Sequence, residues 1–415
     1  MASVSKLALM ATVLAALVVI GCQPSAEGPG NLPALGVPDA DLKALAEGNN
    51  AFAIDLYKKL AAESDGNVVV SPYSIRTALA MTYAGARGET ASEMAKVLGF
   101  GSQNEKVHAA AQSLAGKLSR TLNVGRQEFR SRNSLWLNEQ TPFVDDFLRI
   151  ARSNYDAQVT QVDFEQPEVA VAAVNQWVDK ETDGRIRNLL ENRDVSKETR
   201  LVLANATFLK GLWQYPFDKS KTADAKFFAS SSRTAKVKMM QLELEARFWE
   251  GNGIKIASIP LQKNTASMMV IVPNQVDGLA AIESKLTPKL LSAWYKDQTE
   301  VNLSLHFPRW TVRNKYDLVP TLRAMGMERP FDPKADFSGI SQGIGLSKVI
   351  HEATVVVDEE GSEATAATAV VGAVPVIETI PLKHLELKVE RPFCFAIWDH
   401  GTQSILFMGR VALPD

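Results

Sequence analysis

The segment at residues 351–382 reads HEATVVVDEEGSEATAATAVVGAVPVIETIPL, and it joins an apolar run to a long series of small residues. Glycines and β-branched residues make a helix over residues 358–382 unfavourable. As a strand, the segment would place mainly small side chains on one face: Ser362, Ala364, Ala366, Thr368 and Val370. Such a face would let the strand slide between two existing strands, with Glu363 on the opposite face. The alternative is a solvated linker, although a long linker inside a compact domain is uncommon and usually functional.

The rest of the chain has an uneven distribution of expected elements. Hydrophobic spacing and capping signals predict helices in the first half, over residues 41–62, from Pro72 onward, and over 89–98, 106–118 and 169–180. Short apolar runs predict strands over residues 67–70, 134–138, 159–164, 201–209, 254–260, 268–272, 301–307, 346–357, 385–389, 393–398 and 405–411. Helices followed by strands, rather than alternating βαβ units, predict an α+β fold with large sheets.

Composition excludes several classes of protein. The chain has 415 residues, of which 46% are hydrophobic and 22% charged, as in an ordinary globular protein. Its 45 Lys and Arg against 47 Asp and Glu give a net charge of −2, which argues against nucleic acid as a partner. Two cysteines and five histidines are too few for a disulfide-dense scaffold or a multi-cysteine zinc site. We therefore expect no metal and no cofactor.

The N-terminus has the pattern of a targeting segment. Lys6 precedes the apolar run LALMATVLAALVVI at residues 7–20, which is too short to span a bilayer comfortably. The run ends before Gly21-Cys22, which resembles a bacterial lipoprotein box. That resemblance implies a signal peptide at residues 1–21, a lipid on Cys22, and a Pro/Gly-rich flexible tether at 22–40. Gln23 after the cysteine favours the outer membrane of the cell envelope, on its periplasmic or outer face. A secretory signal that happens to contain a cysteine is the alternative.

One catalytic motif occurs, but its context is wrong. Gly339-Ile-Ser341-Gln-Gly343 matches the G-x-S-x-G nucleophile elbow, and Asp358 and His384 or His400 follow in hydrolase order. An elbow needs a buried strand before the serine and a helix after it. The sequence predicts a loop before Ser341 and a strand after it. We therefore expect that the chain is not an enzyme.

Five stretches resemble the serpin family. They are NVVVSPYSI at 67–75, NATFLKGLW at 205–213 with Phe217, HEATVVVDEEGSEA at 351–364, LKVERPFCFAI at 387–397, and FMGRV at 407–411. Glu390 departs from the family pattern, in which an amide or Asp is usual. The resemblance covers residues 41–415. It implies one serpin domain of α+β class, with three β-sheets, about nine helices and an exposed reactive-centre loop near residues 358–382.

The resemblance also implies a function. A target serine protease, or in some cases a cysteine protease, cleaves the loop and forms a covalent acyl-enzyme. The cleaved loop then inserts into the large β-sheet and deacylation stalls. The expected activity is thus irreversible, suicide-type protease inhibition by a monomer without a cofactor. A non-inhibitory serpin acting in binding or storage is the alternative.

Three groups of residues take roles from the resemblance. The hinge is Glu359, Glu360, Gly361, Ser362, Glu363, Ala364, Thr365, Ala366, Ala367 and Thr368. The shutter, a buried polar network that controls sheet opening, is Ser71, Ser74, Asn205 and His351. The breach, at the top of the sheet, is Trp213, Arg309 and Glu359, with an ion pair between the last two.

The number of residues that usually separates the hinge from the cleaved bond in this family predicts the position of the reactive bond. Counted from Glu359, it leads to Pro375–Val376, with Val374 and Ile377 as alternative acyl residues. Proline is a poor acyl residue because its ring fixes φ. The small aliphatic residues favour an elastase-like or subtilisin-like protease. A trypsin-like target is disfavoured because the first basic residue after the hinge is Lys383.

Overall fold

The computed structural model describes residues 37–100, 104–123, 127–361 and 381–414. Several of the predictions above lie outside these residues: the signal peptide, Cys22, most of the tether, hinge residues 362–368 and the candidate bond at residues 374–377. No helix in the described ranges is long and apolar enough to cross a bilayer.

A five-stranded sheet includes the strand that was expected at residues 346–357. Its strand order is β10 (Trp310–Asp317), β11 (Lys348–Val357), β4 (Leu201–Lys210), β2 (Glu128–Asn138) and β3 (Gln158–Val162). The central pair, β11 and β4, is parallel, and its ladder runs from Lys348–Val202 to Ala353–Thr207. Both strands continue beyond that point, to Val357 and to Lys210.

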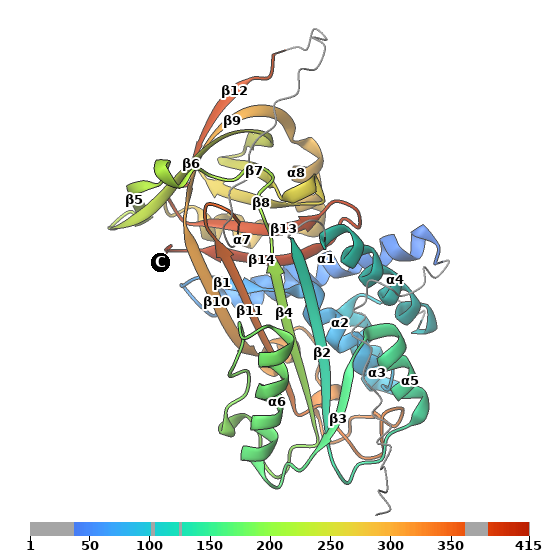
Figure 1. The fold of residues 1–415 in the computed structure, drawn as a ribbon. Helices are drawn as coiled ribbons and strands as arrows, with labels where there is room; N and C mark the ends of the chain where they lie inside the picture. Colours follow the sequence, from blue (N-terminus) through green and yellow to red (C-terminus); the bar gives the residue numbers. More distant parts are fainter. Residues whose placement is uncertain (1–36, 101–103, 124–126, 362–380, 415) are drawn as a thin grey trace, which may run out of the picture.

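The other strands form one nine-stranded sheet in the upper half of Figure 1. Its path is β1 (Val68–Val70), β14 (Ile405–Val411), β13 (Phe393–Asp399), β8 (Ala266–Pro273), β7 (Ile254–Pro260), β6 (Arg233–Gly251), β9 (Thr299–Pro308) and β12 (His384–Lys388), with β5 (Ala223–Ser230) also on β6. The middle of β6 pairs with β9, and its last residues pair with β7. Two of the three expected sheets are therefore continuous through this 19-residue strand.

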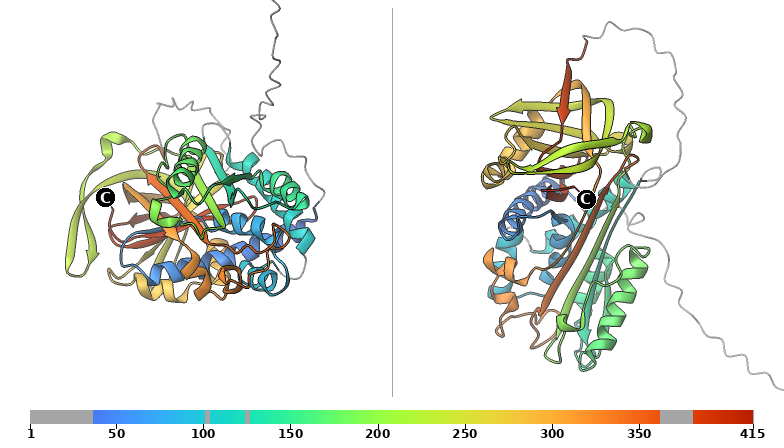
Figure 2. Two further views of the ribbon diagram at one scale, coloured as in Figure 1. Left: turned by 90° about the horizontal axis from the view of Figure 1, so that it is seen from below. Right: turned by 90° about the vertical axis from the view of Figure 1, so that its left-hand side faces the viewer.

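The described residues contain nine α-helices: α1 (Asp39–Ala62), α2 (Pro72–Tyr83), α3 (Gly88–Leu98), α4 (Asn104–Leu122), α5 (Asp145–Tyr155), α6 (Pro167–Glu181), α7 (Leu279–Lys285), α8 (Pro288–Asp297) and α9 (Val319–Ala324). In the right-hand view of Figure 2, α6 covers one face of the five-stranded sheet and the N-terminal helices cover the other.

Successive side chains along the central strands point to opposite faces of the five-stranded sheet. Val202 and Ala204 pack with the α6 core around Trp177, whereas Leu201 and Leu203 belong to the main core on the opposite side. The main core includes residues from Leu42 to Val411. At the level of α6 the central strands are therefore buried on both faces, whereas Val356, near the upper end of β11, is 43% exposed.

Most expected elements form, with shifted ends. The first helix begins at Asp39, and the strand expected from residue 134 begins at Glu128. No expected element corresponds to α5, α7, α8, α9, β5, β6 or β10. The α+β expectation is confirmed.

Candidate functional site

The top of the five-stranded sheet is where the segment quoted at the outset leaves β11. The β4–β11 ladder ends at Ala353–Thr207, although β11 continues for four residues, to Val357. Residues 358–361 then turn over this part of the sheet. The strand pair is thus joined along its lower part and has no ladder at the end where the hinge begins.

The hinge backbone is held by the segment that follows β4. The backbone N–H groups of Trp213 and Phe217 donate to the carbonyls of Glu360 (3.3 Å) and Glu359 (2.7 Å). The Trp213 indole N–H donates to the carbonyl of Asp358 at 2.9 Å. The Asp358 carboxylate in turn accepts from the N–H groups of Glu360 and Gly361, both at 3.0 Å. The hinge therefore enters its turn in a fixed conformation.

Gly361 is required by this turn. Its φ of +102° lies in a region that residues with a Cβ rarely adopt. A Cβ built there would also lie 2.3 Å from the carbonyl oxygen of Gly211 and 2.6 Å from the Cα of Leu212. The close approach of the hinge to the end of β4 is therefore possible only without a side chain.

The two hinge carboxylates have different partners. Glu359 is 4% exposed; its Oε1 accepts from the Thr222 hydroxyl at 2.8 Å, and its Oε2 lies 3.8 Å from the Arg309 guanidinium. The Arg309–Glu359 pair is the one expected from the resemblance. Glu360 pairs with Lys219 at 2.6 Å, on the solvent side. Sequence reasoning missed Lys219 and Thr222, since nothing in the pattern ties the 219–222 turn to the hinge.

The four shutter residues meet below the hinge. The Ser74 hydroxyl donates to Asn205 Oδ1 at 2.6 Å, and His351 Nδ1 lies 2.9 Å from the same oxygen. His351 Nε2 accepts from the backbone N–H of Ser71 at 3.2 Å. Because Asn205 Oδ1 only accepts and the Ser71 N–H only donates, His351 is the neutral tautomer with its proton on Nδ1.

The network extends to residues that were not predicted. Asn205 Nδ2 donates to Asn133 Oδ1 at 2.8 Å, and the Thr207 hydroxyl donates to Ser74. The Ser71 hydroxyl donates to the carbonyl of Leu406 in β14 at 2.8 Å. The network thus joins β4, β11 and β2 to the start of α2 and to the second sheet. It lies at the lower, paired part of the β4–β11 ladder.

Asn205 is the hub of this network, and its loss is expected to cost stability. Asn205→Ala leaves His351 Nδ1 and Asn133 Oδ1 buried without a partner, which costs about 1–3 kcal/mol for each unpaired group, whereas the Ser74 hydroxyl keeps its contacts with Ser131 and Thr207. We expect the free energy of unfolding to fall by about 3 kcal/mol or more in urea titrations. The exposed Asn302→Ala is the matched control and should change it by less than about 0.5 kcal/mol. Equal stabilities for the two variants would contradict the role of the network.

Burial makes the shutter sensitive to acid. Desolvation lowers the pKa of His351 from 6.5 to about 3. Below pH 6.5 the unfolded chain therefore binds a proton that the folded chain does not, so stability should fall as pH decreases from about 6.5 towards 3. The slope from His351 should approach 1.4 kcal/mol per pH unit. Burial also lowers the pKa of His108, to about 4, and that of His400, and both add to the slope.

Unfolding in urea between pH 4 and pH 7 measures this slope. His351→Gln should make it shallower by about 1 kcal/mol per pH unit, whereas the exposed His384→Gln should leave it as in the wild type. A slope that is the same in all three proteins would show that His351 does not titrate as argued.

The remaining sequence candidates show no catalytic arrangement. Ser341 is buried and lies between the short helix Arg329–Phe331 and β11, so neither a preceding strand nor a following helix forms an elbow. Burial raises the pKa of the Cys394 thiol, which lies 3.4 Å from the Tyr57 hydroxyl. Among the residues that the structure describes, no three His, Cys, Asp or Glu side chains are grouped as a metal site.

Comparisons with known proteins agree on one family. The family model described as "Serpin (serine protease inhibitor)" matches residues 47–414. Human Serpin B3 is 34% identical over 396 residues, covering 90% of this chain and all of the relative. The leukocyte elastase inhibitor of Equus caballus is 35% identical over 389 residues, with the same coverage. The crystal structure of human thyroxine-binding globulin complexed with its hormone has a TM-score of 0.79 and 28% identity, covering 90% of this chain and 99% of that one.

Proposed function

This chain belongs to the serpin family, and we propose that it is an irreversible, suicide-type inhibitor of serine endopeptidases. Protease inhibition is the activity named for the family and for relatives such as the leukocyte elastase inhibitors. The observation that carries the proposal for this chain is the β4–β11 pair, which is parallel and whose ladder stops at Ala353–Thr207, beside the hinge. A strand that begins after Gly361 can enter at that point.

The mechanism is supported by the direction of the strands. Both β4 and β11 run towards the hinge, so a loop that reverses at Gly361 would enter antiparallel to both and could pair on each side. In the reaction, the protease serine attacks a loop carbonyl and the peptide bond breaks. The protonated new amine becomes the N-terminus of the segment that runs to residue 415, which stays in the fold through β12, β13 and β14. The protease stays joined to the N-terminal part by an ester. Insertion of the loop then carries the ester away before water can hydrolyse it.

Loop composition supports inhibition rather than a passive role. The inserted strand would have to bury one face against the main core of the protein. Residues 362, 364, 366 and 368 are Ser, Ala, Ala and Thr, which are small enough for such a face. Bulky or charged residues there would stop entry, because a buried unpaired charge is costly.

We propose an elastase-like or subtilisin-like target. The support is the aliphatic sequence around Pro375–Val376, together with the names of the leukocyte elastase inhibitors among the relatives. The protein should be incubated with pancreatic and neutrophil elastase, subtilisin and trypsin, and examined on an SDS gel. We expect a covalent complex with the first three and none with trypsin. The mass of the released C-terminal peptide gives the bond, and a cut outside residues 374–378 would refute our assignment.

A carrier or storage protein is the second candidate. It is favoured by the likeness to thyroxine-binding globulin and by a cavity of about 920 Å³ lined by α1, α4 and α8. Its lining includes Leu42, Leu114 and Trp398. A carrier would not need its loop to enter the sheet. The change in Tm after loop cleavage therefore distinguishes an inhibitor from a carrier.

We propose further that the mature protein is anchored in the outer membrane by a lipid on Cys22, on the periplasmic or the outer face. The support is the lipoprotein-like sequence and the Pro/Gly-rich tether at residues 22–40. In a bacterial host supplied with a radiolabelled fatty acid, the wild-type protein should carry label and sediment with membranes. Cys22→Ser should lose both properties, whereas Cys394→Ser should keep them. Label on both variants would contradict this site.

A further inference from the structure

Four residues between β4 and β5 hold the hinge from outside the sheet: Trp213, Phe217, Lys219 and Thr222, which we call the clasp. Trp213 and Phe217 bind the hinge through backbone N–H groups, and their rings pack edge to face with centroids 6.0 Å apart. Thr222 binds the buried Glu359 carboxylate, and Lys219 binds Glu360. The clasp therefore contacts two consecutive hinge residues through both backbone and side chains.

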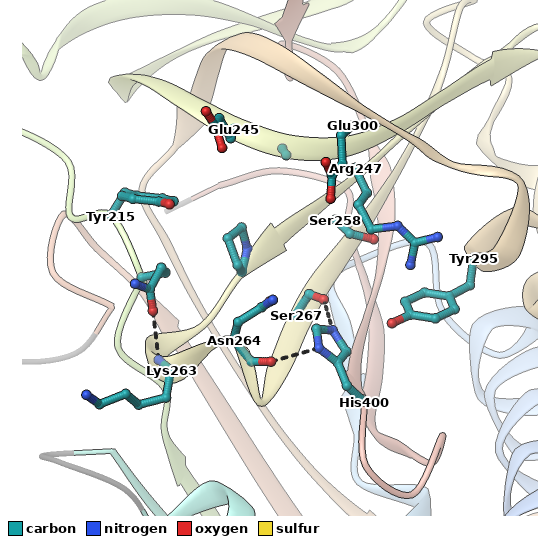
Figure 3. Close-up of a pocket in the computed structure, with 13 residues that line it drawn as sticks. Tyr215, Glu245, Arg247, Ser258, Lys263, Asn264, Ser267, Tyr295, Glu300 and His400 are labelled. Carbon is teal, nitrogen blue, oxygen red and sulfur yellow. Dashed lines mark hydrogen bonds between the residues drawn. The ribbon is translucent and has the colours of Figure 1, made fainter. Parts of the chain in front are cut away.

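The clasp is itself anchored to the second sheet. The Gln214 N–H donates to the carbonyl of Pro260 at 2.9 Å, and its side-chain oxygen accepts from the N–H of Lys263 at 2.7 Å. Lys263 and Asn264 form the turn between β7 and β8, both with positive φ. His400 Nδ1 donates to the carbonyl of Asn264 at 2.9 Å, as Figure 3 shows beside a cavity of about 440 Å³. The clasp is thus tied to a turn that does not belong to the sheet that the loop would enter.

Lys219 is held in place for this contact. It opens the one-turn helix Lys219–Lys221, whose preceding residue Asp218 accepts from the N–H of Ser220 at 2.9 Å. The hydrogen bond to Glu360 raises the pKa of Lys219, so the ammonium group is charged at neutral pH. The two ion pairs of the hinge differ in exposure. The side chains of Lys219 and Glu360 are 62% and 19% exposed, whereas the side chain of Glu359, which pairs with Arg309, is 6% exposed.

The contacts of Glu360 lie next to the expected point of loop entry. The loop would begin to insert at residue 362, two residues after Glu360, whose carbonyl and carboxylate are held by Trp213 and Lys219. We propose that Lys219 is a positioning residue that slows entry of the loop into the sheet, and that its pair with Glu360 makes the rate of entry rise with ionic strength. An exposed pair is screened by salt, whereas the buried Glu359 contacts are screened much less. This inference rests on the proposed function, since it assumes that the loop inserts.

The test measures entry without a protease. A synthetic peptide with the sequence of residues 362–375 is incubated with the intact full-length protein, and its uptake is followed by native gel and by the rise in Tm. The variants are Lys219→Gln, Glu360→Gln and the double variant. Lys221→Gln is the matched control, because it removes the same charge from the same turn. Rates are compared in 20 mM and 1 M NaCl.

At low salt we expect each single variant to take up the peptide about two to five times faster than the wild type, the effect of one partly exposed ion pair. The double variant should be no faster than the singles, because both remove the same contact. Lys221→Gln should match the wild type. High salt should raise the wild-type rate to that of Lys219→Gln and leave Lys219→Gln unchanged.

Two results would overturn the inference: equal rates for Lys219→Gln, Glu360→Gln and wild type at low salt, or a double variant faster than either single by the product of their effects. The proposed function fails in a different way. If the wild-type protein takes up no peptide and gains no Tm after loop cleavage, then the loop does not insert at all. If cleavage raises Tm but Lys219 has no effect on the rate, only the role of Lys219 is wrong.

Discussion

Replacing Ser362 by arginine, or Ala364 by proline, is expected to turn this protein from an inhibitor into a substrate. The target protease should still cleave the loop, but the covalent complex on an SDS gel should fall by about tenfold or more. Both residues would lie on the inward face of the entering strand, within the first residues after Gly361. Arginine would place an unpaired charge on the buried face of the strand, and proline would remove a ladder N–H. Entry would then be slower than deacylation, so the protease would be released.

Glu363→Arg is the matched control for Ser362→Arg. It introduces the same side chain one residue along the chain, on the opposite face of the strand. It should keep at least half of the covalent complex. If Ser362→Arg and Ala364→Pro both form as much complex as the wild type, loop insertion is not the source of inhibition. If Glu363→Arg loses the complex to the same extent, the face of the strand does not matter.

The sequence predicted the shutter because its residues lie in long motifs. Ser71 and Ser74 come from one stretch, Asn205 from a second and His351 from a third, and each stretch resembles the family over several consecutive residues. Trp213 and Glu359 also lie in these stretches, whereas Arg309 lies outside them and was expected only as the partner that the resemblance implies for Glu359. The motifs do not predict which groups of the network are hydrogen-bonded to one another. That depends on the register of β4 and β11, which places Asn205 opposite His351.

Lys219 was missed for a different reason. It lies in a one-turn helix after β4, and its partner Glu360 is far along the chain. The sequence around a charged residue in a polar turn does not show whether its side chain forms an ion pair or is only solvated. Only the three-dimensional path of the segment after Trp213 brings the two residues together.

The strand β6 has a clear periodicity in the sequence, although it was not among the expected elements. Between residues 242 and 248, apolar residues alternate with Glu243, Glu245 and Arg247, which is the period of a half-exposed strand. The sequence could therefore have predicted the strand. It could not have predicted that β6 pairs with β9 along its middle and with β7 at its end, because that depends on its length and position relative to both strands.

A single cut in the loop should make this protein more stable, which is the reverse of the usual effect of proteolysis. Residues 362–375 span about 45–50 Å when extended, at 3.3–3.6 Å per residue. The strand β11 has 10 residues and is about 33 Å long, so the released loop can reach along the whole of it. A strand placed between β4 and β11 would form ladders on both sides, and each hydrogen bond contributes about 1 kcal/mol net. It would also replace the incomplete parallel ladder, which ends at Ala353–Thr207.

We expect Tm to rise by about 10 °C or more after cleavage by subtilisin or elastase at low enzyme concentration, because each net kcal/mol is worth about 1–2 °C in a domain of this size. The control is Ala364→Pro cleaved in the same way, which should gain less than half of this increase. A cut in the loop also removes a connection between β11 and β12, so a protein that cannot insert its loop should keep its Tm or lose stability. An unchanged or lower Tm in the cleaved wild type would exclude the inhibitory mechanism and favour the carrier. A large rise in the wild type and a small one in Ala364→Pro would establish that the energy for trapping a protease is stored in the uninserted sheet.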